Sequence, residues 1–140
     1  GDADIIQKFT RYRTYHGCAM PLHHQIASEW AWGDEEHVIT NRARYREKFE
    51  AVLPILSSVL PTPKPNAGFY LWPQTPVDDE RFAQTVYEKA GVSVLPGRYL
   101  ARETAAGNPG AMRVRIALVA ELSQCVEAAE RIAECLRHDW

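Results

Sequence analysis

The stretch Met112-Arg113-Val114-Arg115-Ile116-Ala117-Leu118 places an apolar residue at every second position. This period of two predicts a β-strand, because successive side chains of a strand point to opposite faces. One face of the strand is then apolar and suited to a core. The other face carries Arg113, Arg115 and Ala117.

The two arginines of this strand are the strongest candidates for a binding function. On one strand face their side chains start about 7 Å apart. A guanidinium group suits a carboxylate because its planar fork donates two parallel hydrogen bonds, and the small Ala117 leaves room beside them. A solvated strand face, on which Arg113 and Arg115 make intramolecular ion pairs, is the alternative interpretation. The spacing is compatible with both.

Two further strands are expected upstream of this one. The aromatic run Gly68-Phe69-Tyr70-Leu71-Trp72 has high strand propensity and is followed by Pro73. Val92-Ser93-Val94-Leu95 predicts a second short strand, which Pro96-Gly97 closes.

Two helices complete this part of the chain. The first is expected to start after the N-cap Asp78, with Val77 and Phe82 as a hydrophobic staple, and to stop at Gly91. Apolar residues at helical spacing from Leu122 predict a second, amphipathic helix at the C-terminus. The resulting order β-α-β-β-α predicts an α+β fold, a small sheet covered by helices.

The N-terminal part of the sequence is expected to be helical. Apolar periodicity predicts helices over residues 2–16, from Leu22 to Gly33, and from Asp34 to about residue 56, with a kink or an early end near Pro54. The proline-rich segment 61–66 then forms an extended connector. We therefore expect three regions: a helical segment 1–33, a long connecting helix 34–60 and an α+β domain 61–140.

Composition is typical of an ordinary globular domain. The 140 residues are 46% hydrophobic and 24% charged, which excludes a disordered tail, a collagen-like rod and a coiled coil. A net charge of −2 argues against a nucleic-acid or membrane-surface partner. We expect no signal peptide and no membrane span. Cys18, Cys125 and Cys135 show no paired spacing, so free thiols and a cytoplasmic location are expected.

Other potential sites are given structural interpretations. The spacing of His16, Cys18, His23 and His24 matches no zinc pattern, so no metal site is expected. Glycine-rich phosphate-binding motifs are absent from the sequence. The acidic cluster Asp78-Asp79-Glu80 is assigned to the dipole of the helix that it begins.

The motifs N-A-G-F-Y-L-W, V-S-V-L-P-G and R-V-R-I-A-L, in this order and separated by a helix, resemble the small domain of class I/II aminotransferases. These are fold-type-I α/β enzymes that depend on pyridoxal 5'-phosphate. The segments R-Y-R-T-Y-H-G-C-A-M-P and N-R-A-R-Y-R-E-K-F are most similar to the succinyldiaminopimelate transaminases of bacterial lysine biosynthesis. The resemblance covers nearly the whole chain and implies that residues 1–33 end the large domain.

The resemblance also implies a role for Arg115. In this family, the arginine that precedes an I-A or similar pair in the last strand holds the substrate α-carboxylate, and Arg113 lies two positions too early. Arg113 and Arg98 are candidates for a second cationic contact, because both expected substrates, N-succinyl-diaminopimelate and 2-oxoglutarate, carry a further carboxylate. Arg98 also departs from the family, which often has a small or hydroxyl residue after P-G.

The cofactor lysine of the family has no counterpart in this sequence. Lys8, Lys48, Lys64 and Lys89 all lack the S-x-S-K-like context of the Schiff-base lysine. We therefore expect the chain to be the C-terminal third of a homodimeric enzyme and to be inactive alone, with pyridoxal phosphate bound mainly by the upstream domain. The loop 16–21 either approaches the cofactor phosphate of a neighbouring subunit or only connects two helices. The competing hypothesis is a self-contained, non-catalytic α+β module that binds an amino-acid-like anion.

Overall fold

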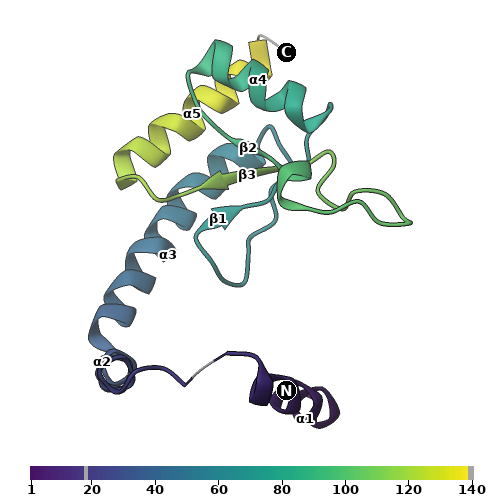
Figure 1. The fold of residues 1–140 in the computed structure, drawn as a ribbon. Coiled ribbons are helices and arrows are strands. Elements are labelled where there is room, and N and C mark those ends of the chain that lie inside the picture. The colour runs from purple at the N-terminus through teal and green to yellow at the C-terminus, as the bar shows by residue number, and fades with distance from the viewer. Residues whose placement is uncertain (18, 139–140) are drawn as a thin grey trace. The chain divides into compact units, whose positions relative to one another are not determined.

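The computed structural model describes residues 1–17 and 19–138 (Figure 1). The chain forms two compact units, Gly1–Ile39 and Thr40–Trp140. The boundary between the units falls inside a long helix. The division at residues 33 and 60 that the sequence suggests stays a prediction.

The first unit is helical. Helix α1 spans Ala3–Tyr15 and is capped by Asp2, whose Oδ1 accepts a hydrogen bond from the Ile5 N–H at 3.0 Å. Helix α2 spans Leu22–Gly33, directly after Pro21. Neither helix contains a buried residue. Both predicted helices are confirmed, whereas Cys18 of the loop between them lies outside the described residues.

Helix α3 spans Glu36–Ser57 and continues into the second unit. Asp34 Oδ1 accepts a hydrogen bond from the Glu36 N–H at 3.1 Å, at the start of this helix. Pro54 lies inside the helix, which ends three residues later at Ser57. Phe49, Val52 and Leu56 lie on one side of α3 and are buried in the core.

A three-stranded antiparallel sheet organises the second unit. Its strands are β1 (Tyr70–Leu71), β2 (Leu95–Pro96) and β3 (Val114–Ala117), arranged in the order β1-β3-β2. The longest strand therefore lies in the centre, and β1 and β2 form the two edges. Along the chain, the order of strands and helices matches the predicted β-α-β-β-α arrangement. A short 3₁₀ helix, Gly97–Leu100, follows β2.

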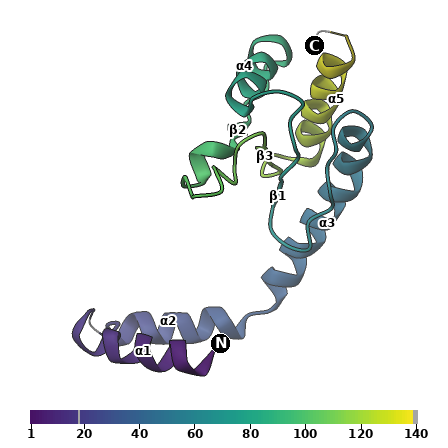
Figure 2. The same cartoon turned by 90° about the vertical axis from the view of Figure 1, so that its right-hand side faces the viewer.

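Helices cover one face of this sheet. Helix α4 (Asp79–Ala90) packs against α5 (Leu122–His138), and both contribute to one core with α3 (Figure 2). The core also receives Val114 and Ile116 from β3 and Leu71 from β1. The caps of α4 form as expected. Asp78 Oδ1 accepts from two N–H groups of the first turn, and Gly91 adopts a φ of 65° at the end.

The strands are shorter than the sequence indicates. Residues 92–94 form no ladder, and pairing starts only at Leu95. Met112 was expected on the buried face of β3 but has a φ of 58° and is 38% exposed. A left-handed backbone cannot continue a strand, so β3 begins two residues later. Within the described residues, no helix combines the length and apolarity needed to cross a membrane.

Candidate functional site

Arg115 lies on the central strand of the sheet, with a neighbouring strand on each side. On one side it pairs with Leu95 of β2. On the other side, the register Leu71↔Ile116 and the bridge Gln74↔Arg113 place Trp72 opposite Arg115. Because opposite residues of an antiparallel pair project to the same face, Leu95 and Trp72 flank the arginine.

The face that carries Arg115 is not the one packed on the core. Val114 and Ile116 are buried against the helices, whereas Ala117 is exposed and Arg115 is half-buried. Tyr70 pairs with Ala117 and therefore shares the arginine's face. The predicted alternation of β3 is confirmed for these residues.

The Arg115 guanidinium contains an unsatisfied polar group. Its Nε is buried and, within the described part of the chain, makes no hydrogen bond. Buried donors are nearly always paired in folded proteins, and an unpaired one costs about 1–3 kcal/mol. This N–H therefore has hydrogen-bonding capacity that the described residues do not use. A carboxylate is the acceptor that matches a guanidinium best.

Trp72 encloses this region of the sheet. A Cβ placed on Gly97 would lie 3.0 Å from Trp72 Cη2, so the indole of an edge-strand residue reaches across β3 to the residue after β2. The same Cβ would lie 2.2 Å from the carbonyl oxygen of Gly110. Only glycine at position 97 leaves room for both contacts. This close packing explains why the P-G motif has glycine at its second position.

Arg113 differs from Arg115 in its contacts. Its Nη1 donates to the carbonyl oxygen of Trp72 at 3.3 Å, and its carbonyl accepts from the Gly97 N–H at 2.7 Å. Neither arginine forms an ion pair with any described residue. The intramolecular ion pairs of the alternative interpretation are therefore not seen among the described residues, and the role of this strand face stays a prediction.

Arg98 is engaged by carboxylates of α4. Its guanidinium donates to Asp78 and Glu80, and its Nε and Nη2 donate to Asp79 Oδ1 at 2.9 and 2.7 Å. Asp79 and Asp78 raise its pKa, with the Asp79 hydrogen bond as the largest cause. Arg98 is thus committed within the fold and is a poor candidate for a substrate contact.

Asp79 has a role that the sequence did not reveal. Its side chain is fully buried, and it also accepts hydrogen bonds from the backbone N–H groups of Arg98 and Met112. Burial favours a higher pKa for this carboxyl, but its hydrogen bonds, first those from Arg98, together outweigh burial and leave the pKa below its ordinary value. Asp79 therefore ties together both ends of the 98–112 loop, which precedes β3. The helix dipole alone does not explain it.

The lysines do not form a cofactor site. Lys8 pairs with Asp4 at 2.7 Å on the surface of α1, and Lys48 Nζ donates to the Leu118 carbonyl oxygen at 3.1 Å. Lys64 lies in the proline-rich connector, and Lys89 lies in the last turn of α4. The described residues therefore do not fit a Schiff-base site for pyridoxal phosphate. They also include no cluster of potential metal ligands.

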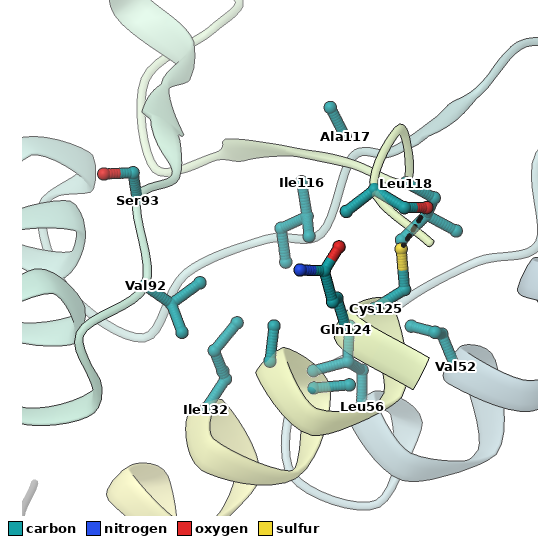
Figure 3. Close-up of a pocket in the computed structure, with 13 residues that line it drawn as sticks. Val52, Leu56, Val92, Ser93, Ile116, Ala117, Leu118, Gln124, Cys125 and Ile132 are labelled. Atoms are coloured by element: carbon teal, nitrogen blue, oxygen red, sulfur yellow. Dashed lines mark hydrogen bonds between the residues drawn. The ribbon is translucent and has the colours of Figure 1, made fainter. Parts of the chain in front are cut away.

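A small cavity of about 80 Å³ lies between β3 and the helices α3 and α5 (Figure 3). Most of its lining is apolar, including Ile116, Val52 and Ile132, and Ser93 and Gln124 add polar groups. Cys125 borders this cavity, and its Sγ–H donates to the Ala120 carbonyl oxygen at 3.4 Å. Burial raises the pKa of the Cys125 thiol. Neither the cavity nor this cysteine has the features of a reactive site.

Comparison with known proteins identifies the class of this chain. The family model for aminotransferase class I and II matches residues 10–132, and the chain belongs to this family. Enzymes of the family depend on pyridoxal phosphate. The identification confirms the α+β aminotransferase resemblance that the motifs indicated.

Three similar proteins are themselves aminotransferases. An aminotransferase structure from Neisseria meningitidis is 53% identical, with a TM-score of 0.83, and the match covers 98% of this chain. A probable N-succinyldiaminopimelate aminotransferase from Thermus thermophilus is 37% identical over 72% of this chain, with a TM-score of 0.59. An LL-diaminopimelate aminotransferase from Desulforudis audaxviator is 35% identical over 74% of this chain. This chain covers 35%, 26% and 26% of these proteins, respectively.

Proposed function

We propose that this chain is the substrate-carboxylate-binding part of a pyridoxal-phosphate-dependent aminotransferase. The observation that carries the proposal is the buried, unpartnered Nε of Arg115 on the central strand. Arg115 holds the α-carboxylate that amino donor and acceptor share, and so positions the reacting carbon. Membership in a family of enzymes argues against the alternative of a self-contained binding module.

The proposed substrates are N-succinyl-diaminopimelate and 2-oxoglutarate, which places the enzyme in lysine biosynthesis. Two similarities support this choice, one to an N-succinyldiaminopimelate aminotransferase and one to an LL-diaminopimelate aminotransferase. Similarities to aspartate and aromatic-amino-acid aminotransferases are weaker in identity, at 27% to 29%.

The proposal also covers the organisation of the enzyme. Residues 1–33 belong to the large domain, residues 34–60 form the connecting helix, and residues 61–140 form the small domain. Pyridoxal phosphate supplies the electron sink for transamination and is bound mainly by protein outside this chain, since the described lysines fit no Schiff base. The intact enzyme is a cytoplasmic homodimer in this proposal.

Substitution of Arg115 in the intact enzyme tests the proposal. Arg115→Ala is expected to raise the KM and lower the turnover for both amino donor and amino acceptor, because both lose the same carboxylate contact. Exposed Arg81 on α4 offers a matched control, and Arg81→Ala should leave both reactions unchanged. Near-normal kinetics of Arg115→Ala would contradict the assignment.

A further inference from the structure

The carboxylate of Asp79 lies at the loop end of the ladder that contains Arg115. In this ladder Leu95 of β2 pairs with Arg115 of β3. Arg98 follows Leu95 by three residues, and its backbone N–H donates to Asp79 Oδ2 at 3.0 Å. Met112 precedes Arg115 by three residues, and its N–H donates to Asp79 Oδ1 at 3.3 Å. The carboxylate therefore joins the two chain segments just beyond the point where their pairing ends.

The ladder between β2 and β3 is short. Strand β2 spans Leu95–Pro96, and proline has no N–H to donate. The next hydrogen bond toward the loop runs from the Gly97 N–H to the Arg113 carbonyl oxygen, at 2.7 Å. Because so short a strand contributes few ladder bonds, the position of β2 beside Arg115 depends on what holds its far end. Asp79 is the group at that end.

Met112 is held from two sides in an unfavourable conformation. Its φ of 58° lies in the left-handed region, which a residue with a side chain seldom adopts. Its N–H donates to Asp79, and its carbonyl oxygen accepts from the Thr75 N–H at 2.8 Å. A strained backbone of this kind persists only where its surroundings fix it. Since the chain enters β3 through Met112, Asp79 helps to determine where that strand begins.

The loop between the two held residues is exposed. Residues 102–106 are open to solvent, and in Figure 1 this green segment extends away from the sheet. The ends of the loop touch, because a Cβ on Gly110 would lie 2.1 Å from the Gly97 carbonyl oxygen. Hydrogen bonds from both ends to one carboxylate keep any movement of the exposed part from reaching β3.

A buried carboxylate is a costly way to stabilise a fold. The side chain of Asp79 is fully buried, and a buried ion pair often contributes no more stability than apolar residues of the same volume. An apolar side chain, however, offers no acceptor to a backbone N–H. The two oxygens of Asp79 accept from two separate segments of the chain, Arg98 and Met112. This arrangement favours a role in the geometry of the sheet.

We propose that Asp79 is a positioning residue for the substrate carboxylate, and that it orients Arg115 by fixing β2 and β3 to the first turn of α4. The inference rests on the proposed function of Arg115. Asp79 acts through β3 and does not touch the substrate in this proposal, because its carboxylate is fully buried.

Kinetics of Asp79→Asn in the intact enzyme test this inference. Asparagine has nearly the same volume but only one accepting oxygen, so it cannot accept from both Arg98 and Met112. The KM for the amino donor and for the amino acceptor should each rise about tenfold, because Arg115 is displaced. A merely structural role would reduce the number of folded molecules, which lowers kcat and leaves both KM values unchanged. Glu80→Gln is the matched control: its carboxylate accepts from the side chains of Arg98 and Tyr99, and both KM values should stay unchanged.

A second variant separates positioning from stability. Asp79→Asn combined with Arg98→Gln removes both charges, so no guanidinium is left without its buried partner. This double variant should resist urea better than Asp79→Asn alone but keep the raised KM values. A return of both KM values to normal together with the stability would overturn the inference.

A double-mutant cycle tests whether Asp79 acts through Arg115. Arg115→Lys should raise both KM values by itself, and Asp79→Asn added to it should raise them by less than about twofold more. Effects of the two substitutions that multiply independently would overturn the inference, as would unchanged KM values for Asp79→Asn alone. Normal KM values for Arg115→Lys would instead contradict the proposed function, whatever the effect of Asp79→Asn.

Discussion

The buried carboxylate of Asp79 accepts hydrogen bonds from both the backbone and the guanidinium of Arg98, at 3.0 and 2.7–2.9 Å. The two residues are 19 positions apart in the chain. This pair fixes the start of the loop before β3 to the first turn of α4. The N–H of Met112, which donates to the same carboxylate at 3.3 Å, fixes the end of that loop.

Replacement of this carboxylate should destabilise the second unit. Asp79→Asn removes the negative charge beside Arg98. It also leaves some of the N–H groups of Arg98 and Met112 that donate to Asp79 without an acceptor. We expect a loss of about 2–3 kcal/mol in the free energy of unfolding, below the range for a fully buried pair because Arg98 keeps Asp78 and Glu80. Urea denaturation measures this free energy of unfolding. Glu80→Gln is the control and should cost less, because Glu80 is partly exposed. Equal losses for the two variants would contradict the central role of Asp79.

The contribution of Asp79 to stability should depend on pH. Its folded-state pKa lies below the ordinary value of 3.8, so its stabilisation is present above that value. It is lost as the pH falls through the lower, folded-state pKa. The difference in unfolding free energy between the native protein and Asp79→Asn should therefore be constant from pH 7 to about pH 5 and shrink in more acidic solution. A difference that grows on acidification would show that the sign is wrong.

Local features of the fold were predictable from the sequence, because they depend on neighbouring residues. The cap at Asp78 and the stop at Gly91 each involve atoms a few residues apart. The alternation of β3 also follows from its own residues. Strand limits were less predictable: the left-handed Met112 is held by an Asp79 that lies 33 residues away.

The candidate site shows the same division. The two arginines on one strand face were evident from spacing, and the choice of Arg115 came from the family motif. The different surroundings of the arginines became visible only through long-range contacts. Trp72 reaches Gly97 across the sheet, and Arg98 is held by carboxylates of α4. Such contacts join distant parts of the chain, and no local pattern encodes them.

A methyl group at Gly97 should disrupt the sheet near Arg115. The added Cβ would meet the Gly110 carbonyl oxygen at 2.2 Å and the Arg113 carbonyl oxygen at 2.8 Å, and both are backbone atoms that cannot rotate away. We expect Gly97→Ala to lower the free energy of unfolding by about 2–3 kcal/mol. Gly33→Ala is the control, since nothing lies within 4 Å of its Cβ. A stability change at Gly97 no larger than at Gly33 would refute this packing.

The Cys125 thiol should react slowly in the folded protein. It is 6% exposed, and burial raises its pKa, so little thiolate is present at neutral pH. Alkylation by iodoacetamide at about pH 7.5, followed by peptide mass spectrometry, should label Cys125 at least about tenfold faster after unfolding in urea. Equal rates with and without urea would show that the thiol is accessible.

The most direct test of the account is the kinetics of Arg115→Lys in the intact enzyme, measured as kcat/KM for the amino donor and the amino acceptor separately. Lysine keeps the charge but not the planar fork, so the account predicts a loss of about tenfold or more for both substrates. Kinetics within about twofold of the unaltered enzyme for either substrate would contradict the claim that Arg115 holds the carboxylate that the two substrates share.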